Sequence, residues 1–319
     1  MRVSGLLWLV IVPLVVAGDI IKGITWYGFE TENSNVMCLW KNDIDWNLRK
    51  MQELGFNSIR LPFSYQYIQT GVWWEMDKFF EKLKNYNLSV VLDFHRIENT
   101  HQSAKPYTNQ VSFDMFLEAW RIILDRYQHN PKLIAVDIFN EYQSDNYMEW
   151  NNLARQIVNY IESKFPNRFN YYIGGVSWGG DLHFVDLEDL PYSERIFYTI
   201  HKYFFSDTEP FEKRWEYSFG EHKLVVNVGE WGFLSNEPLE VAWAKRFINW
   251  LLSKNIRNTY FFTWSYNSQD TGGILMTDCT TVDNEKMTLL HHFWNNETVP
   301  LIEDDNQKYT KESRKMLRA

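Results

Sequence analysis

Short apolar runs rich in β-branched and aromatic residues alternate along the chain with longer stretches in which apolar positions recur every third or fourth residue. The first pattern is typical of buried strands and the second of amphipathic helices. Together they predict eight strands, at residues 23–30, 58–64, 89–96, 133–141, 169–178, 196–204, 224–233 and 258–266. The helices predicted beside them cover residues 43–54, 75–86, 112–129, 147–165, 211–219, 239–253 and 286–294, with a poorly marked candidate at 183–190.

Strands that alternate with helices in this way indicate an α/β protein with a parallel sheet. Eight such units over about 270 residues favour a single-domain (β/α)8 TIM barrel. The alternative is a doubly wound open sheet, which would place a glycine-rich phosphate-binding turn after its first strand. Residues 23–30, with the sequence GITWYGFE, contain no such turn, so we favour the barrel.

The first eighteen residues have the anatomy of a secretory signal peptide. Met1 and Arg2 form a short basic start, residues 6–16 form an apolar run interrupted only by Pro13, and small residues follow. The run is too short to span a bilayer comfortably, although an uncleaved anchor is the alternative. We expect residues 1–18 to be removed, residues 19–296 to form the folded domain and residues 297–319 to be a charged tail. The mature protein would then be secreted, extracellular and free of the membrane.

The formal net charge of −9 argues against a nucleic-acid partner, since the chain has no basic stripe to neutralise phosphates. Its two cysteines, Cys38 and Cys279, follow the first and the eighth predicted strands, which become neighbours when a barrel closes. A metal site would need more ligands at closer spacing. In a secreted protein we therefore expect a disulfide between them.

Aromatic residues make up 17% of the chain, and fifteen of them are tryptophans. The tryptophans within helical patterns are expected to pack in the core. Others fall in loops or at the ends of strand-like runs, where a flat ring could stack on the apolar face of a sugar: Trp26, Trp40, Trp73, Trp74, Trp178, Trp231 and Trp264. This second set points to a carbohydrate ligand.

Polar residues stand at the carboxyl end of one predicted strand after another. These residues are Glu30, Arg60, Asp93, His95, Asn140, Glu141, Trp178, His201, Tyr203, Glu230 and Trp264. In a barrel these strand ends form the active-site face. Solvation of the strand ends alone would give an arbitrary mixture of polar residues, whereas glutamates, histidines and an arginine are the residues that acid–base chemistry uses.

Two glutamates are singled out by their context. Glu141 is the only member of four Asn-Glu pairs that follows a buried strand pattern, LIAVDIF, and Glu230 follows LVVNV between Gly229 and Gly232. On the fourth and seventh strands of a barrel, their carboxyl groups could face each other across its mouth. A pair roughly 5 Å apart fits a retaining glycosidase.

A metal centre is the competing use of histidine and glutamate residues. The sequence has no HExxH-like spacing, and His95, His201, Glu141 and Glu230 lie on four different predicted strands. We therefore expect neither a metal nor another cofactor.

The motifs GITWYGFET, IRLPFS, LDFHR, DIFNE, IHKY, VGEWG and FTWSYNSQDTGGIL follow one another between residues 23 and 294. Each motif alone is weak evidence for a protein family, but the whole set in this order and at these intervals is specific evidence. The chain resembles the family 5 glycoside hydrolases, and within that family the endo-β-1,4-glucanases, or cellulases. The resemblance covers nearly all of the predicted mature chain.

The resemblance implies a role for each of eight residues. Glu141 would be the acid/base and Glu230 the nucleophile, with Arg60 and Tyr203 bonded to the nucleophile so that it stays ionised and oriented. The other implied positions form the sugar site, in which Asn140 holds the 2-hydroxyl group and Trp264 stacks beneath the sugar, while the polar wall is completed by His95 and His201. The loop at residues 267–273 would line the cleft beside Trp264.

The expected function is that of a secreted, monomeric endo-β-1,4-glucanase that hydrolyses internal bonds of a β-glucan with retention of configuration. Alternatives are the same mechanism on mannan, xyloglucan or mixed-linkage glucan, a carbohydrate-binding barrel that has lost turnover, and a surface-anchored structural protein. Asn87 and Asn296 stand in N-glycosylation sequons, and Asn87 is expected on the face opposite the active site.

Overall fold

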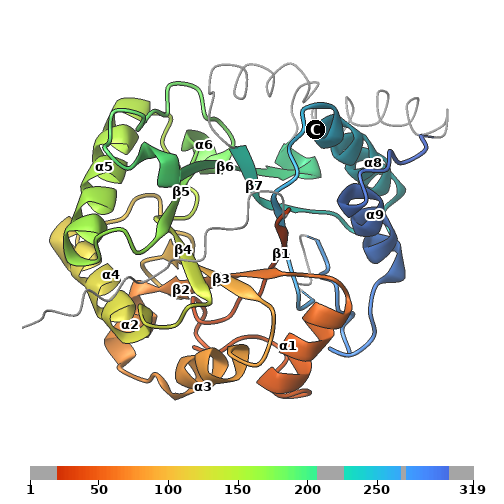
Figure 1. The fold of residues 1–319 in the computed structure, drawn as a ribbon, viewed down its shortest axis with the longest axis horizontal. Helices are drawn as coiled ribbons and strands as arrows, with labels where there is room; N and C mark the ends of the chain where they lie inside the picture. Colours follow the sequence, from red (N-terminus) through yellow and green to blue (C-terminus); the bar gives the residue numbers. More distant parts are fainter. Residues whose placement is uncertain (1–19, 207–225, 267–270, 302–319) are drawn as a thin grey trace, which may run out of the picture.

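The computed structural model describes residues 20–206, 226–266 and 271–301, in which the strands form one closed parallel barrel (Figure 1). The strands are β1 (Lys22–Thr25), β2 (Ser58–Ser64), β3 (Ser89–Arg96), β4 (Leu133–Asp137), β5 (Asn170–Gly174), β6 (Ile196–Tyr203), β7 (Val226–Gly232) and β8 (Thr259–Phe261). Each strand pairs with the next, and β8 pairs with β1. The predicted (β/α)8 barrel is confirmed.

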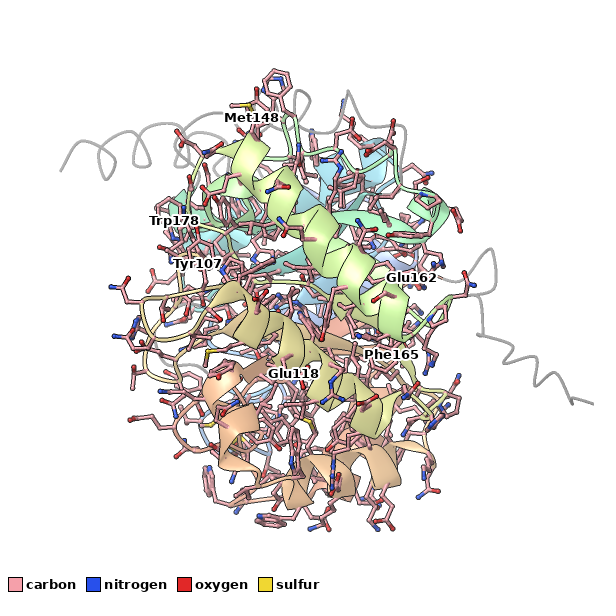
Figure 2. The ribbon with its side chains drawn as sticks, turned by 90° about the vertical axis from the view of Figure 1, so that its left-hand side faces the viewer. Tyr107, Glu118, Met148, Glu162, Phe165 and Trp178 are labelled. Carbon is pink, nitrogen blue, oxygen red and sulfur yellow. A yellow bond between two sulfur atoms is a disulfide. The ribbon has the colours of Figure 1, made fainter. Side chains whose placement is uncertain are left out.

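Helices surround the barrel in Figure 1. They are α1 (Ile44–Glu53), α2 (Tyr65–Thr70), α3 (Trp74–Leu83), α4 (Phe113–Tyr127), α5 (Tyr147–Lys164), α6 (Val176–Gly179), α8 (Pro238–Ser253) and α9 (Asn284–Trp294), with 3-10 turns η1 (Ser193–Arg195) and η2 (Phe204–Ser206). Asp43, Ser112, Asn146 and Asp283 cap α1, α4, α5 and α9 by accepting a backbone N–H. Figure 2 shows α4 and α5 side by side on the outside, with Trp178 toward one edge of the molecule. None of the described helices is long and apolar enough to cross a membrane.

Not every predicted helix is present. The prediction of a helix at 183–190 is wrong, because this segment forms turns. Its backbone is bonded by side chains instead: Asp181 accepts from the His183 N–H at 2.8 Å, and the Tyr198 hydroxyl accepts from the Leu187 N–H at 2.7 Å. Such bonds compete with helical ones. The predicted signal peptide, the helix at 211–219 and residues 302–319 of the tail lie outside the described residues.

Two apolar clusters fill the fold. The larger lies between strands and helices, where Phe63 of β2 and Phe94 of β3 pack against Trp120 of α4. The smaller joins residues of strands on opposite sides of the barrel, including Tyr172 of β5 and Tyr260 of β8, whose hydroxyl groups are 3.4 Å apart. Among the described residues, these side chains therefore occupy the interior of the barrel.

The predicted disulfide joins Cys38 and Cys279, whose Cα atoms are 5.6 Å apart although 241 positions separate them in the chain. It connects the loop after β1 to the loop after β8, on the same side of the barrel as the carboxyl ends of both strands. The Asn42 side chain adds a hydrogen bond to the Cys279 carbonyl at 2.8 Å.

The packed part of the chain extends into the segment predicted as the tail. Val299 is buried, and its backbone N–H and carbonyl are bonded to the Asn249 side chain at 2.7 and 2.8 Å. The sequence pattern gave no signal for this contact, because it depends on α8 lying beside the segment.

Candidate active site

The centre of the site is Arg60 of β2, which is fully buried inside the barrel. Its Nη1 is bonded to Glu230 Oε1, and its Nε donates to Asp137 Oδ2 at 2.9 Å. Its Nη2 donates to Asn140 Oδ1 at 2.8 Å and lies 3.1 Å from Asp93 Oδ2. Because a guanidinium is a rigid planar fork, Arg60 fixes four side chains from three other strands and one loop relative to one another.

Burial and charge act in opposite directions on the carboxyl groups around Arg60. Burial raises the pKa of Asp93 to about 7, although the charge of Arg60 lowers it. Burial likewise raises the pKa of Asp137 to about 6 against the opposing effect of Arg60. Asp93 and Asp137 are register partners on β3 and β4, so repulsion between their charges adds to the cost of ionising both.

Glu230 of β7 is held as a carboxylate. Burial favours its neutral form, but the charges of His201 and Arg60 and a 2.7 Å hydrogen bond from the Tyr203 hydroxyl to its Oε2 hold its pKa well below the usual range. Arg60 and Tyr203 occupy different oxygens of the carboxylate, which fixes the plane of the group. Such an oriented anion could serve as a nucleophile.

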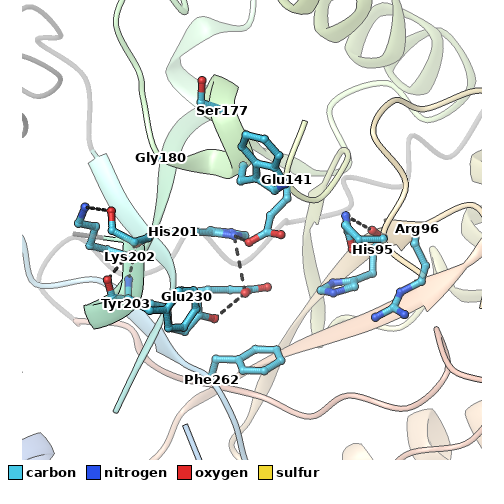
Figure 3. Close-up of a pocket in the computed structure, with 14 residues that line it drawn as sticks. His95, Arg96, Glu141, Ser177, Gly180, His201, Lys202, Tyr203, Glu230 and Phe262 are labelled. Carbon is cyan, nitrogen blue, oxygen red and sulfur yellow. Dashed lines mark hydrogen bonds and ion pairs between the residues drawn. The ribbon is translucent and has the colours of Figure 1, made fainter. Parts of the chain in front are cut away.

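Glu141 follows β4 in the left-handed backbone region, with φ of 50°, and its side chain is 21% exposed. His201 of β6 lies between the two glutamates, with Nδ1 3.1 Å from Glu141 Oε1 and 3.6 Å from Glu230 Oε2 (Figure 3). Burial lowers the pKa of His201, but the two glutamates raise it by a larger amount. The pKa of His201 therefore lies above its usual value. The carboxylate oxygens of Glu141 and Glu230 come within 4.8 Å of each other.

The ring of His201 occupies a slot between two glycines. A Cβ added to Gly229 would lie 2.9 Å from His201 Nε2, and one added to Gly179 would lie 3.1 Å from its Cγ. Gly179 also has φ of +69°. The side chain that lies against the backbone of Gly229 is therefore that of His201.

His95 of β3 is held by Asp93 and Asn140. Its Nδ1 is 2.6 Å from Asp93 Oδ2, and its Nε2 is 3.3 Å from Asn140 Nδ2. Burial and the nearby Arg96 lower the pKa of His95 well below its usual value. A neutral ring with its proton on Nδ1, facing the carboxyl of Asp93, would accept the Asn140 amide hydrogen at Nε2.

A pocket of about 660 Å³ opens above these residues. Of the predicted site residues, Glu141 and Glu230 line it together with His95, His201 and Tyr203. Arg60 and Asn140 lie beneath it and are buried. The structure therefore brings seven of the eight predicted side chains to one place.

Trp264 is the exception, and the prediction that it stacks beneath the sugar is wrong. The ring is completely buried, packs edge-on against Phe56 and donates its Nε1–H to Asn47 Oδ1 at 2.8 Å. Strand β8 ends at Phe261, several residues earlier than the sequence pattern predicts. The aromatic residue that lines the pocket there is Phe262, directly after the strand.

Other tryptophans predicted to stack on sugars also belong to the core. Trp26 and Trp231 are completely buried, and Trp73 is half-buried against Tyr67. Trp178 does line the pocket and is 55% exposed, with its backbone N–H bonded to the Tyr142 carbonyl at 3.0 Å. Two further exposed tryptophans lie outside the lining of this pocket: Trp40 and Trp74.

Several lining residues were not predicted as site residues: Arg96, Gln102, Ser177, Gly180, Lys202, Phe205, Ser206 and Phe262. Arg96 and Lys202 follow His95 and His201 directly, so the strand-end pattern could have included them. The others lie on loops, in the four-residue helix α6 or in the turn η2, where the sequence has no periodicity that assigns a direction to a side chain.

Two sets of possible metal ligands occur among the described residues. Glu230 belongs to both, with Asp93 and His95 in one and Glu141 and His201 in the other. The oxygens of Glu230 already accept hydrogen bonds from Arg60 and Tyr203. A cation bound there would have to displace the protein's own guanidinium, so this donor set fits acid–base chemistry better than a metal centre.

A model of the cellulase family, described as glycosyl hydrolase family 5, matches residues 19–270. The chain belongs to this family. The match takes in β1 to β8 and therefore every predicted site residue. As a member of family 5, the protein is a glycoside hydrolase.

Individual relatives agree with the family match. An endoglucanase of Paenibacillus polymyxa is 27% identical, with 84% of this chain and 81% of the relative covered. The major extracellular endoglucanase of Xanthomonas campestris pv. campestris is 26% identical, with 86% and 67% covered. A variant of an endocellulase from Pyrococcus horikoshii, solved in complex with cellotetraose, superposes with a TM-score of 0.77 at 25% identity, with 86% and 92% covered.

Proposed function

We propose that this family 5 hydrolase is a secreted retaining endo-β-1,4-glucanase that acts by double displacement. The observation that carries the mechanism is the approach of the Glu141 and Glu230 carboxylate oxygens to within 4.8 Å. Retaining glycosidases place their carboxyl groups about 5 Å apart, whereas inverting enzymes leave room for a water between them. The endoglucanase and cellotetraose-bound relatives support a β-1,4-glucan as the substrate.

In the first step, a Glu230 oxygen attacks the anomeric carbon while the glycosidic C–O bond breaks. Glu141 gives its proton to the departing oxygen, so the leaving chain departs as an alcohol and the sugar becomes esterified to Glu230. Arg60 and Tyr203 hold Glu230 ionised and oriented before the attack. His201, bonded to Glu141 and close to Glu230, keeps the two carboxyl groups at a fixed spacing.

In the second step, Glu141 takes a proton from a water molecule, whose oxygen attacks the anomeric carbon from the side that the leaving group vacated. The ester bond to Glu230 breaks, and two inversions give net retention. Glu141, the more exposed carboxyl, is placed where water can reach it.

The aromatic and polar walls would hold the sugar rings. Phe262 would lie beside the sugar at the cleavage point, and Trp178 would stack on a neighbouring ring. Asn140, fixed by Arg60 and His95, is proposed to reach the 2-hydroxyl group when substrate binds. A panel of soluble mannan, xyloglucan and mixed-linkage glucan, compared with a β-1,4-glucan, tests the choice of substrate.

Secretion is proposed from the predicted signal peptide, and the extracellular Xanthomonas relative supports it. Expression in a secreting host followed by mass measurement of the mature N-terminus tests it. A mature chain that begins near residue 19 is expected, and a chain retaining residues 1–18 would contradict the proposal.

The mechanism is tested by shortening each glutamate and adding azide. Glu230→Ala cannot form the covalent intermediate, so azide should attack from the vacated side and yield a glycosyl azide of inverted configuration. Glu141→Ala should retain reaction with an activated aryl glycoside, which needs little protonation, and azide should then release a product of retained configuration.

A matched control is Glu297→Ala, because Glu297 also follows an asparagine but is exposed near the end of the described chain. Its turnover should equal that of the wild type. Swapped azide products would reverse the two roles, and an inverted product from the wild type would refute double displacement.

A further inference from the structure

Lys286 is a buried lysine on α9, outside the lining of the pocket. Its Nζ donates to the carbonyls of Thr271 at 2.6 Å and Gly273 at 2.7 Å, and it lies 3.3 Å from Asp283 Oδ2. An ammonium group has three N–H donors, and each has an acceptor here. The charge of Lys286 is thus used to hold the backbone of the turn at 271–273.

This turn can approach Lys286 because of its two glycines. Gly272 and Gly273 have φ of 72° and 78°, which side chains rarely tolerate. A Cβ on Gly272 would lie 3.2 Å from Lys286 Nζ, and one on Gly273 would lie 2.5 Å from the Ser265 carbonyl oxygen. The backbone of the turn therefore contacts the Lys286 ammonium on one side and the backbone of Ser265, after β8, on the other.

The turn in its place holds Phe262. The Thr271 hydroxyl donates to the Phe262 carbonyl, and the Phe262 N–H donates to the Trp231 carbonyl at 2.8 Å. Gly232 leaves the space in which Phe262 and Thr271 meet, because a Cβ at this position would lie 2.4 Å from the Phe262 carbonyl oxygen and 2.5 Å from Thr271 Cγ2. The backbone of Phe262 is thus fixed on both sides.

Phe262 and Glu230 both line the pocket (Figure 3), and the ring of Phe262 lies at right angles to that of Tyr203, with centroids 6.4 Å apart. The Tyr203 hydroxyl in turn donates to Glu230. A small movement of the Phe262 backbone would therefore move a wall of the pocket beside the group that attacks the substrate.

We propose that Lys286 and Thr271 are positioning residues, which act through the turn at 271–273 to hold Phe262 against the sugar beside Glu230. The chain of contacts runs from the Lys286 ammonium to the Thr271 carbonyl, and from the Thr271 hydroxyl to the Phe262 carbonyl. The proposal rests on the proposed function, since it takes Phe262 to contact the substrate.

The test is a double-mutant cycle between Thr271 and Phe262. Thr271→Val removes the hydroxyl but keeps the shape, and we expect it to lower kcat/KM on a soluble β-1,4-glucan by roughly tenfold, since small misplacements at a reacting centre are costly. Thr271→Ser keeps the hydroxyl and should retain most of the activity. In a Phe262→Ala background, Thr271→Val should have little further effect, because residues that act through one another are not additive.

Lys286 is tested by a pair of variants in the same assay. Lys286→Met keeps length but loses all three donors, and it should lower kcat/KM in the same direction as Thr271→Val. Lys286→Arg can still donate to the two carbonyls and should recover part of the loss. Thr288→Val is the matched control, because Thr288 is exposed on the same helix and its hydroxyl also bonds a carbonyl, that of Asn284 at 2.8 Å.

Thr271→Val with wild-type kcat/KM, or with the same loss in both backgrounds, would overturn the proposal. The hydrogen bond itself is measured by urea unfolding, where Thr271→Val should be less stable than Thr271→Ser in both backgrounds, because Phe262→Ala keeps the backbone carbonyl that accepts the bond. A wild type that does not hydrolyse β-1,4-glucan would refute the proposed function. Absent coupling between Thr271 and Phe262 in kcat/KM, with an active wild type, would refute the positioning role alone.

Discussion

Arg60 is surrounded by Glu230, Asp93 and Asp137, so one buried cation faces three buried carboxyl groups. Full ionisation would leave excess buried negative charge, which is costly. The three carboxyl groups differ in the direction of their pKa shifts: the pKa of Glu230 is lowered, and those of Asp93 and Asp137 are raised. Of the three carboxyl groups, Glu230, the one proposed to react, is therefore the one that Arg60 most readily stabilises in its ionised form.

This division predicts how stability depends on pH. In the unfolded chain an aspartate titrates near a pKa of about 3.9. In the folded protein Asp137 and Asp93 release their protons only near pKa values of about 6 and about 7. Between these limits the folded state binds more protons than the unfolded state, so the free energy of unfolding should fall as pH rises from about 4 to about 7. His201, whose pKa is raised, contributes in the same direction.

Asp93→Asn should reduce the decrease in unfolding free energy with rising pH, because an asparagine does not titrate. This expectation concerns the slope and does not depend on how stable the variant is at any single pH. Urea unfolding at a series of pH values measures the slope. Asp77→Asn is the control: hydrogen bonds from Arg126 lower the pKa of Asp77, so its removal should not reduce the fall. Equal slopes for the wild type and Asp93→Asn would show that Asp93 ionises normally in the folded state.

Two tryptophans should differ in what they support. Trp264→Ala removes a completely buried ring and should lower the free energy of unfolding by about 3 to 5 kcal/mol. Trp178→Ala removes a half-exposed ring from the pocket and should change stability little while raising KM for β-glucan. Urea unfolding and steady-state kinetics on both variants measure the difference. A stable Trp264→Ala protein with impaired substrate binding would restore Trp264 to the sugar site.

At the scale of elements, the sequence predicts the strands well where a buried strand is bounded by turns. Strands β2 and β3 have the predicted ends, and β6 ends one residue early. Strands β4 and β8 were predicted too long, because the loops that follow them keep an apolar, extended pattern. Beyond β8, for example, the Trp264 N–H is bonded to the Thr25 carbonyl at 2.8 Å, outside the regular ladder.

The same distinction explains which site residues could be predicted. Arg60, His95, His201, Tyr203 and Glu230 stand on strands, where a period of two assigns each side chain to one face. Phe262 and Trp178 depend on how the chain turns after a strand, and local pattern does not determine that direction. The error at Trp264 has this cause.

The disulfide ties two such loops, and its loss should show mainly in stability. We expect a Cys38→Ser, Cys279→Ser double variant to lose about 2 to 5 kcal/mol of unfolding free energy, because the bond closes a long loop in the unfolded chain. Activity at low temperature should persist, since neither cysteine lines the pocket. Reduced wild-type protein should unfold like the variant. An unchanged unfolding midpoint in both would show that the loops are held by other contacts.

At the scale of the whole molecule, the barrel separates two faces. The carboxyl ends of the strands carry the pocket, and the amino ends carry connections such as the one at Asn87, which is exposed two residues before β3. Loops at the active-site face govern function, whereas the opposite face contributes mainly to stability. A bulky group should therefore have different effects on the two faces.

Glycans provide that test in a host that glycosylates secreted proteins. A glycan on the natural sequon at Asn87 should leave kcat/KM on soluble β-glucan unchanged, because Asn87 lies at the amino end of β3. His101→Thr creates a new sequon at Asn99, on the loop after β3 that also carries the pocket residue Gln102. A glycan at Asn99 should lower kcat/KM on the polymer more than on a small aryl glycoside, since a long chain must cross the obstructed rim.

Enzymatic removal of each glycan, with occupancy measured by mass, isolates its effect from that of the substitution. Activity that changes sharply when the Asn87 glycan is removed would mean that this face also takes part in substrate binding.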